Sequence, residues 1–175
     1  MNKKNQLIKK IHTAFKNVKL EDGIGLWEAQ GLDDRLTEKE CEKLREKDEK
    51  NDWNIIPVLD LYKCSSSLSF FDAKGMRFHL PQLMLYYLDV FEEEELALDK
   101  KGKLKGYGCP DIVFDLSYKI ETPDQLKRFS ALNIEQIQCV LYFLEYLLDD
   151  DDTIELRKTI TVWKAIKQNK LKQTQ

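Results

Sequence analysis

The sequence predicts an α+β fold that is predominantly helical, with a small antiparallel β-hairpin at about residues 69–80 packed on a bundle of about five to seven helices. Three observations support this fold class. Two short aromatic runs flank a glycine-containing turn, an apolar segment follows them directly, and amphipathic stripes with capping signals occupy much of the remaining chain.

The expected hairpin turns at Ala73-Lys74-Gly75, because a glycine that ends a three-residue loop suits the left-handed position of a bulged hairpin. In the second expected strand, apolar side chains alternate with Arg77 and His79, so one face is apolar and the other is polar. Pro81 then begins a helix that is apolar on nearly every side and is expected to lie in the middle of the domain. This hairpin and helix are the predicted core.

The N-terminal half carries three further helix signals. An apolar stripe with lysines opposite it predicts a helix over 7–18. Thr37 and Glu40 form a capping box that begins a charged surface helix ending near residue 49. Pro57 can open another short helix that runs through residue 61.

In the C-terminal half, alternating side chains predict a strand at 112–119, after a glycine-containing connection at 99–111. Capping signals at Thr122 and Asn133 begin two more helices, and Asp152 is expected to cap the last one. Residues 1–152 are therefore expected to form a single globular domain. Residues 153–175 are expected to form a basic helix packed on that domain or extending from it, with a disordered tail after about residue 170.

The composition is typical of a folded chain, with 42% hydrophobic and 34% charged residues among 175. No stretch approaches the length of a membrane span, and lysines interrupt the only candidate for a secretory signal, so we expect no membrane association and a cytoplasmic location. Widely spaced cysteines favour reduced thiols, and they are Cys41, Cys64, Cys109 and Cys139.

The net charge of −3 is distributed unevenly along the chain. Residues 1–20 hold six lysines and no acid, residues 153–175 carry a net charge of +5, and residues 21–152 carry −14. Acidic runs occur at 92–95 and 149–152. One interpretation is that basic terminal helices pack beside an acidic body or are simply solvated, and the other is that an acidic face meets a basic partner.

The run FFDAKGMRFHLP at 70–81, with an Asp-Trp…Ile-Pro step before it, resembles an uncharacterised bacterial domain family that has a recurring (F)LDxxGxRFxLP pattern. A later L…Q…FL segment of that family is matched by Leu132, by Gln136 or Gln138, and by Phe143-Leu144. The resemblance covers roughly residues 7–148 and implies a compact bacterial α+β domain. It implies no established activity, so no catalytic residues follow from it.

Candidate catalytic groups are few. Asp72, Arg77 and His79 are the weak candidates for a polar site, because hairpin neighbours meet across strands and a general base needs an orienting partner. A reactive thiol would draw on Cys109 or Cys64. The sequence shows no ligand set for a metal and no phosphate loop, so we expect no metal and no cofactor. Nucleic-acid binding is not expected at a pI of about 5.6.

Three functions remain open. The leading hypothesis is a non-catalytic domain of a bacterial cytosolic protein that binds a protein partner, with an immunity-like or antitoxin-like version in which the acidic middle covers a basic partner. The alternatives are an enzyme of unrecognised class with a polar site near residues 72–79, and a structural module that associates with itself through its terminal helices. The sequence does not fix the oligomeric state.

Overall fold

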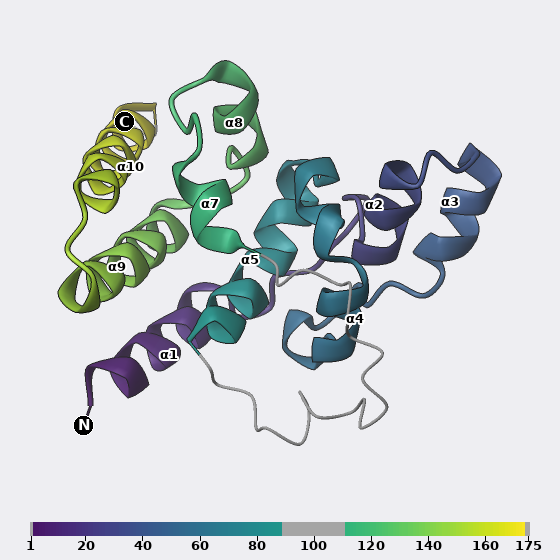
Figure 1. Ribbon diagram of the computed structural model, residues 1–175, viewed down its shortest axis with the longest axis horizontal. Coiled ribbons are helices and arrows are strands. Elements are labelled where there is room, and N and C mark those ends of the chain that lie inside the picture. Colours follow the sequence, from purple (N-terminus) through teal and green to yellow (C-terminus); the bar gives the residue numbers. More distant parts are fainter. Residues whose placement is uncertain (1, 89–110, 174–175) are drawn as a thin grey trace. The chain divides into compact units, whose positions relative to one another are not determined.

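A computed structural model describes residues 2–88 and 111–173 of the chain. All regular elements within these ranges are α-helices or short 3-10 helices, and neither range contains a strand (Figure 1). The chain divides into two compact units. Unit 1 combines residues 1–16 with residues 113–175, and unit 2 comprises residues 17–112.

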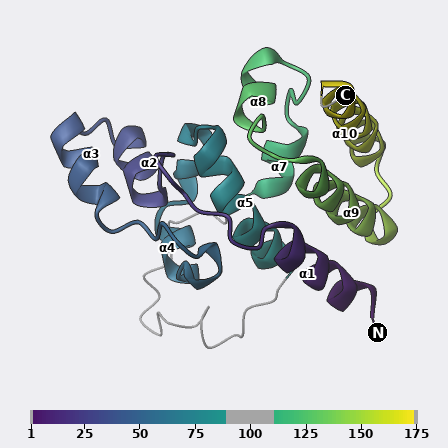
Figure 2. The same cartoon turned by 180° about the vertical axis from the view of Figure 1, so that it is seen from behind.

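Unit 1 is arranged around the long helix α9 (Ile134–Asp150), against which α1 (Lys3–Ala14) and α10 (Ile154–Gln173) both pack (Figures 1 and 2). The short helices α7 (Ile112–Ser117) and α8 (Pro123–Arg128) precede α9. Trp163 of α10 is fully buried, and its indole Nε1 donates a hydrogen bond to the carbonyl of Leu116, 2.9 Å away. That bond ties α10 to the end of α7.

The start of α9 confirms the capping box predicted from the sequence. The Asn133 side chain accepts a hydrogen bond from the backbone N–H of Gln136 at 2.8 Å, and Gln136 Oε1 accepts one from the Asn133 N–H at 3.0 Å. Gln136 Nε2 also donates to the carbonyl of Ala14 at 3.3 Å. The same cap therefore links the first turn of α9 to the end of α1.

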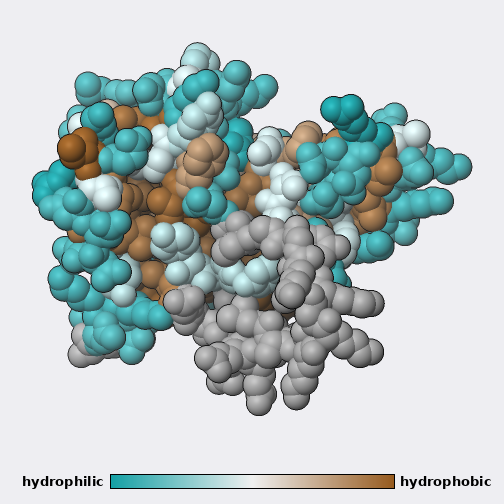
Figure 3. Space-filling model, in the orientation of Figure 1, coloured by the Kyte–Doolittle hydropathy of each residue, from teal (hydrophilic) through white to brown (hydrophobic). Residues whose placement is uncertain are grey.

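Unit 2 contains six helical elements in its described part. They are α2 (Leu26–Asp33), α3 (Glu38–Arg45), η1 (Trp53–Ile55), α4 (Val58–Lys63), η2 (Ser65–Phe70) and α5 (Ala73–Tyr87). Helix α5 is buried almost throughout and forms the core of this unit. The capping box of Thr37 and Glu40 at the start of α3 is confirmed, and apolar side chains show between α2 and α3 in Figure 3.

The predicted β-hairpin at 69–80, and with it the α+β fold class, is wrong, because these residues form the end of η2 and the first half of α5. The carboxylate of Asp72 caps α5 by accepting the N–H of Gly75 at 2.7 Å. Gly75 lies in the first turn of the helix rather than in a loop. A Cβ at this position would lie 2.3 Å from the carbonyl oxygen of Ile24, so the glycine permits a close backbone approach.

The alternation that suggested a strand arose because α5 is buried on nearly every side. Only Arg77 interrupts the buried run from Gly75 to Tyr86, and His79 of the expected polar face is 1% exposed. A helix without a polar face has no helical period to detect. Pro81 lies inside α5 rather than at its start, so the predicted beginning of the central helix is also wrong.

Two other predictions need correction. The strand expected at 112–119 is replaced by α7, whose apolar residues pack as a short helix. The last helix begins at Ile154 with the Thr153 hydroxyl accepting the Leu156 N–H at 3.2 Å, whereas Asp152 forms an ion pair with Arg157.

Some expectations fall outside the described residues, namely the acidic run at 92–95, nearly all of the connection expected at 99–111, and Cys109. Among the helices of the described ranges, none has both the length and the apolar character needed to cross a bilayer.

Candidate functional site

The three side chains predicted to form a polar site serve different partners. Asp72 Oδ1 accepts the N–H groups of Gly75 and Ile24, the latter at 3.0 Å, and so joins the start of α5 to the loop before α2. Arg77 Nη2 pairs with Glu21 Oε1 at 2.8 Å. His79 points into the protein. The structure therefore assigns capping to Asp72 and surface pairing to Arg77, whereas His79 lines a cavity.

His79 is held in one orientation by three neighbours. Its Nδ1 lies 2.8 Å from the carbonyl oxygen of Gly75, to which it donates a hydrogen bond. Its ring stacks on Phe71 with centroids 4.4 Å apart and meets the edge of Phe78 at 5.1 Å. Burial lowers the pKa of His79 to about 4, so the ring is neutral at pH 7. With Nδ1 engaged, Nε2 is the ring nitrogen left to accept a hydrogen bond.

His79 forms part of the wall of a cavity of about 250 Å³ in unit 2. The wall is built from the start of α2, the segment after α3, η1 with the residues that follow it, α4 and α5. Its residues are Leu26, Trp27, Lys47, Asp48, Glu49, Ile55, Ile56, Pro57, Asp60 and His79. Segments far apart in the sequence therefore meet here.

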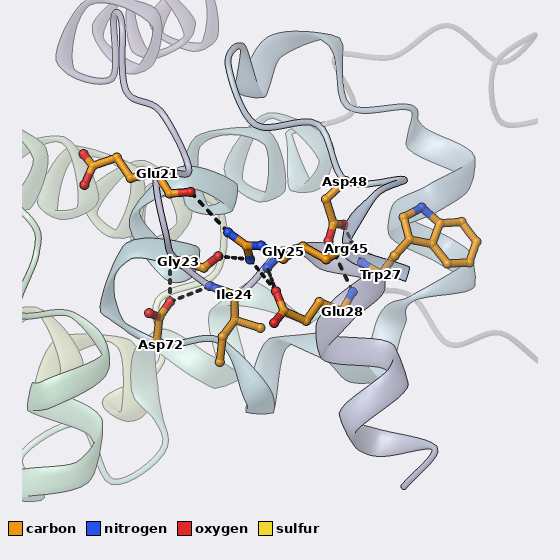
Figure 4. A network of polar contacts seen from close by, with 10 residues as sticks. Glu21, Gly23, Ile24, Gly25, Trp27, Glu28, Arg45, Asp48 and Asp72 are labelled. Atoms are coloured by element: carbon orange, nitrogen blue, oxygen red, sulfur yellow. Dashed lines mark hydrogen bonds and ion pairs between the residues drawn. The ribbon is translucent and has the colours of Figure 1, made fainter. Parts of the chain in front are cut away.

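Asp48 supplies the N-terminal cap of α2 from a distant loop. Its carboxylate accepts the N–H of Trp27 at 2.6 Å and that of Glu28 at 3.3 Å (Figure 4). A Cβ on Gly25 would lie 2.0 Å from Asp48 Oδ2, so only glycine leaves room for this carboxylate. Burial raises the pKa of Asp48 to about 6, although the two backbone donors favour the charged form.

Trp27 and Asp60 also form part of the wall. The Trp27 indole Nε1 donates to Asp60 Oδ2 at 3.2 Å, which leaves Oδ1 of that carboxylate available as an acceptor. The ammonium of Lys47 lies 5.0 Å from the centroid of the Trp27 ring. Glu49 Oε1 accepts three backbone N–H groups at 2.7 to 3.0 Å, so this loop carboxylate is also fixed in place.

The loop that leads into α2 is held by Arg45 of α3 (Figure 4). The guanidinium donates to the carbonyl of Gly23 and to Glu28 Oε2 through Nη1, and to the carbonyl of Glu21 at 3.2 Å through Nη2. Because Glu28 also accepts the N–H of Gly25, one arginine orders the whole entry to α2. The cavity is thus supported by a preformed network.

The cavity is rich in hydrogen-bond acceptors. It presents the carboxylates of Asp48, Glu49 and Asp60 together with the imidazole of His79, and Lys47 is the single cation among its lining residues. Within the described ranges, no three His, Cys, Asp or Glu side chains lie close enough to hold a metal ion together. The arrangement is suited to a ligand that donates hydrogen bonds or carries positive charge.

The described cysteines are not poised as nucleophiles. Cys41, Cys64 and Cys139 are free thiols and are buried. Burial raises the pKa of Cys64 and of Cys139 to about 12, so both remain protonated at neutral pH.

Sequence reasoning found His79 but placed it on the wrong element, and it missed Asp48 and Asp60 as site residues. Asp48 belongs to a charged run that resembles any solvated helix end, and its cap on α2 depends on a tertiary contact. Gly25 stands at the N-cap of α2, where Ser, Thr, Asp or Asn is the usual residue, so the helix lacks a side-chain cap of its own.

Comparison with known proteins gives a family. Residues 3–170 match a family described as a family of unknown function (DUF6714). The chain belongs to this family. No curated protein and no solved structure matches it. Membership in DUF6714 confirms the sequence-based assignment to a domain family of unknown function, and its description names no activity. Function must therefore be argued from the site.

Proposed function

We propose that this member of DUF6714 is a non-catalytic protein-binding domain of a bacterial cytosolic protein, and that the cavity of unit 2 receives a lysine or arginine side chain of a basic partner. The observation that carries the proposal is the acceptor-rich wall, to which Asp48, Asp60 and His79 all contribute and in which Asp60 accepts the indole N–H of Trp27. An immunity-like or antitoxin-like role is the version in which the partner is a basic toxin.

The chemistry of the wall favours a cationic group. Carboxylates bind an ammonium or guanidinium through charge-assisted hydrogen bonds, and the Lys47 ammonium, 5.0 Å from the centroid of the Trp27 ring, shows that this wall already faces a cation. His79 adds a neutral acceptor that does not repel a cation, since its pKa lies far below neutral pH. Cavities of this kind anchor one side chain of a larger interface.

The charge of the surrounding unit supports the same partner. Unit 2 contains 21 acidic and 14 basic residues, whereas unit 1 contains 10 acidic and 14 basic residues. Exposed acids on α2, on α3 and in their connections include Asp33, Asp34, Glu38, Glu42 and Glu46. A surface of net negative charge accelerates encounter with a basic protein and makes the association rate sensitive to salt.

The test is capture of the partner at low salt from the native bacterium, followed by affinity measurements with the purified partner. Asp60→Asn removes one acceptor charge from the wall, and we expect binding to weaken about tenfold or more. Asp124→Asn is the matched control, because it removes the same charge from an exposed position of unit 1 that lines no part of the cavity and is not among the acids of α2 and α3. Failure to capture any basic protein, or equal affinities for both variants, would refute the proposal.

An enzyme of unrecognised class is the second candidate, and the presence of His79 in a cavity with three carboxylates is the observation that favours it. It ranks lower because a histidine with a pKa of about 4 is a weak base at neutral pH. In this case His79→Gln would abolish turnover of a small substrate, whereas in a binding domain the same substitution would only weaken partner affinity.

A further inference from the structure

Unit 1 contains a second concave surface, which the proposed function does not use. It is a groove of about 500 Å³ over the first half of α9, bordered by α1 on one side and by α10 on the other. We call it the α9 groove. Its lining residues from α1 and α10 are Lys9, Lys10, Thr13, Ala14 and Lys167, and those from α9 are Ile134, Glu135, Gln138, Cys139 and Tyr142.

Three ammonium groups border the α9 groove, and none of them pairs with a carboxylate of the described chain. The Lys10 ammonium lies 3.5 Å from the centroid of the Tyr142 ring. The Lys167 ammonium donates to the amide oxygen of Gln138. Lys9 makes no ion pair with any described residue. Glu135 is the single carboxylate of the lining, so positive charge predominates.

The second half of the same outward face of α9 is different. There Lys164 pairs with Glu145 at 3.4 Å, and Lys3 pairs with Asp149 at 2.8 Å. Carboxylates of α9 thus match lysines of α10 and α1 at one end of the helix. At the other end an amide and an aromatic ring stand in the equivalent places, and the lysines are left unmatched.

The floor of the α9 groove is apolar. Ala14, Ile134 and Cys139 contribute to it, and Cys139 is 2% exposed. An apolar strip between cations is complementary to a segment in which carboxylates flank an apolar side chain. No carboxylate of the described chain neutralises the lysines along this strip.

We propose that the α9 groove binds an acidic peptide segment of a partner protein, whose carboxylates pair with Lys9, Lys10 and Lys167 while an apolar side chain lies on the floor. Most of the lining residues are exposed or half-buried, so the groove covers one side of its ligand, as helix-in-groove and peptide sites do. A single-stranded nucleic acid is disfavoured because Lys10 occupies the face of Tyr142 on which a base would stack.

The test uses short fluorescein-labelled peptides and the full chain. One peptide places glutamates around leucines, a second replaces the glutamates by lysines, and a third replaces the leucines by serines. Fluorescence anisotropy should show the first peptide binding about tenfold more tightly than the other two, with an affinity that falls as salt screens the charges.

Variants locate the binding. The double variant Lys9→Gln/Lys167→Gln should weaken binding of the first peptide about fivefold, and Ala14→Phe should abolish it by filling the floor without changing charge. Lys158→Gln, an exposed position of α10 outside the groove, is the control and should leave binding unchanged. Circular dichroism of each variant establishes that it is folded.

Equal binding of the acidic and basic peptides, or equal effects of the groove and control variants, would overturn the proposal. Dodecanoate binding without peptide binding would overturn it in favour of a small anionic amphiphile. Salt-sensitive self-association that the double variant abolishes would overturn it in favour of a second copy of this chain. The Asp60→Asn variant should bind the first peptide with the affinity of the wild type. The test of the α9 groove is therefore independent of whether the cavity of unit 2 binds a basic partner.

Discussion

The cavity of unit 2 and the α9 groove of unit 1 differ in how their charged groups are held. In the cavity, Asp48 and His79 are buried and already engaged in hydrogen bonds that the fold needs. In the groove, Lys9 and Lys10 are exposed and hold no structural ion pair with the described chain.

This difference separates two kinds of functional surface. Where polar groups are buried, substitution changes stability and binding together, because the same atoms cap helices and would contact a ligand. Where they are exposed, substitution changes binding alone. The comparison therefore predicts which variants will report on function cleanly and which will first disturb the fold.

The largest expected effect is a pH dependence that is hidden in the wild type. The pKa of Asp48 is raised to about 6 in the folded state, so its contribution to stability is present at low pH and is lost as pH rises from about 4 to 6. The pKa of His79 is lowered to about 4, so its contribution is present above about pH 6.5 and is lost as pH falls. The two trends oppose each other and are each of the order of 3 kcal/mol.

Single variants should uncover each trend. In His79→Gln, urea unfolding should show stability falling as pH rises from 4 to 6, because the Asp48 contribution then acts alone. In Asp48→Asn, stability should instead fall as pH drops through the same range. At each pH, the free energy of unfolding of the variant is subtracted from that of the wild type. This difference removes the pH dependence that both proteins share through their surface carboxylates. Parallel curves for all three proteins would contradict the assignment of these pKa shifts.

The next effect concerns the glycine beside the Asp48 cap. Gly25→Ala places a Cβ within 2.0 Å of Asp48 Oδ2, so the carboxylate must leave the N–H groups of Trp27 and Glu28. We expect the free energy of unfolding to fall by about 2 kcal/mol. Ala29→Gly lies in the same helix at a fully buried position, and its cost of about 1 kcal/mol from helix propensity and about 1 kcal/mol from the lost methyl group gives the scale. An unchanged unfolding midpoint in Gly25→Ala would show that the cap is dispensable.

A smaller effect is expected at the cavity wall. Trp27→Phe keeps an aromatic ring but removes the Nε1 donor to Asp60. Loss of this hydrogen bond should lower the free energy of unfolding by about 1 kcal/mol. Partner affinity should fall as well, because Asp60 is then free to rotate away from the cavity. Chemical unfolding and binding measurements on one preparation check both expectations.

The smallest effect on stability belongs to the α9 groove. Lys9→Gln should leave the free energy of unfolding within about 0.5 kcal/mol of the wild type. The same variant should still bind the acidic peptide with a measurably lower affinity than the wild type. A clear loss of stability in Lys9→Gln would mean that this lysine has a structural role, and it would remove the contrast between the two regions.

The parts of the fold that could be predicted from the sequence are those set by local chemistry. Thr37 with Glu40, and Asn133 with Gln136, are capping boxes whose partners lie within one turn, and both are confirmed. The expectation of a domain family of unknown function is also confirmed, by a match over residues 3–170. These signals do not depend on how distant segments meet.

The parts that could not be predicted depend on tertiary contacts. Gly75 resembles a turn glycine until the carbonyl of Ile24 is seen against it, and the helix around it has no polar face to reveal its period. The cavity depends on Asp48 reaching the first turn of α2, a contact that no spacing in the sequence encodes. The sequence pattern places His79 on the polar face of a hairpin as a weak catalytic candidate, and its burial becomes visible only when α5 is known to be a helix.

The Asp48 cap has a consequence for local opening. The N–H groups of Trp27 and Glu28 in the first turn of α2 both donate to the carboxylate of Asp48, which lies in the segment after α3. Local unfolding of either segment therefore breaks the hydrogen bonds that hold the other. Hydrogen exchange should therefore report Trp27, Glu28 and the amides of residues 50–52, which Glu49 holds, as one cooperative unit rather than as two independent loops. A ligand that seats beside Asp48 would slow exchange in both stretches of chain at once.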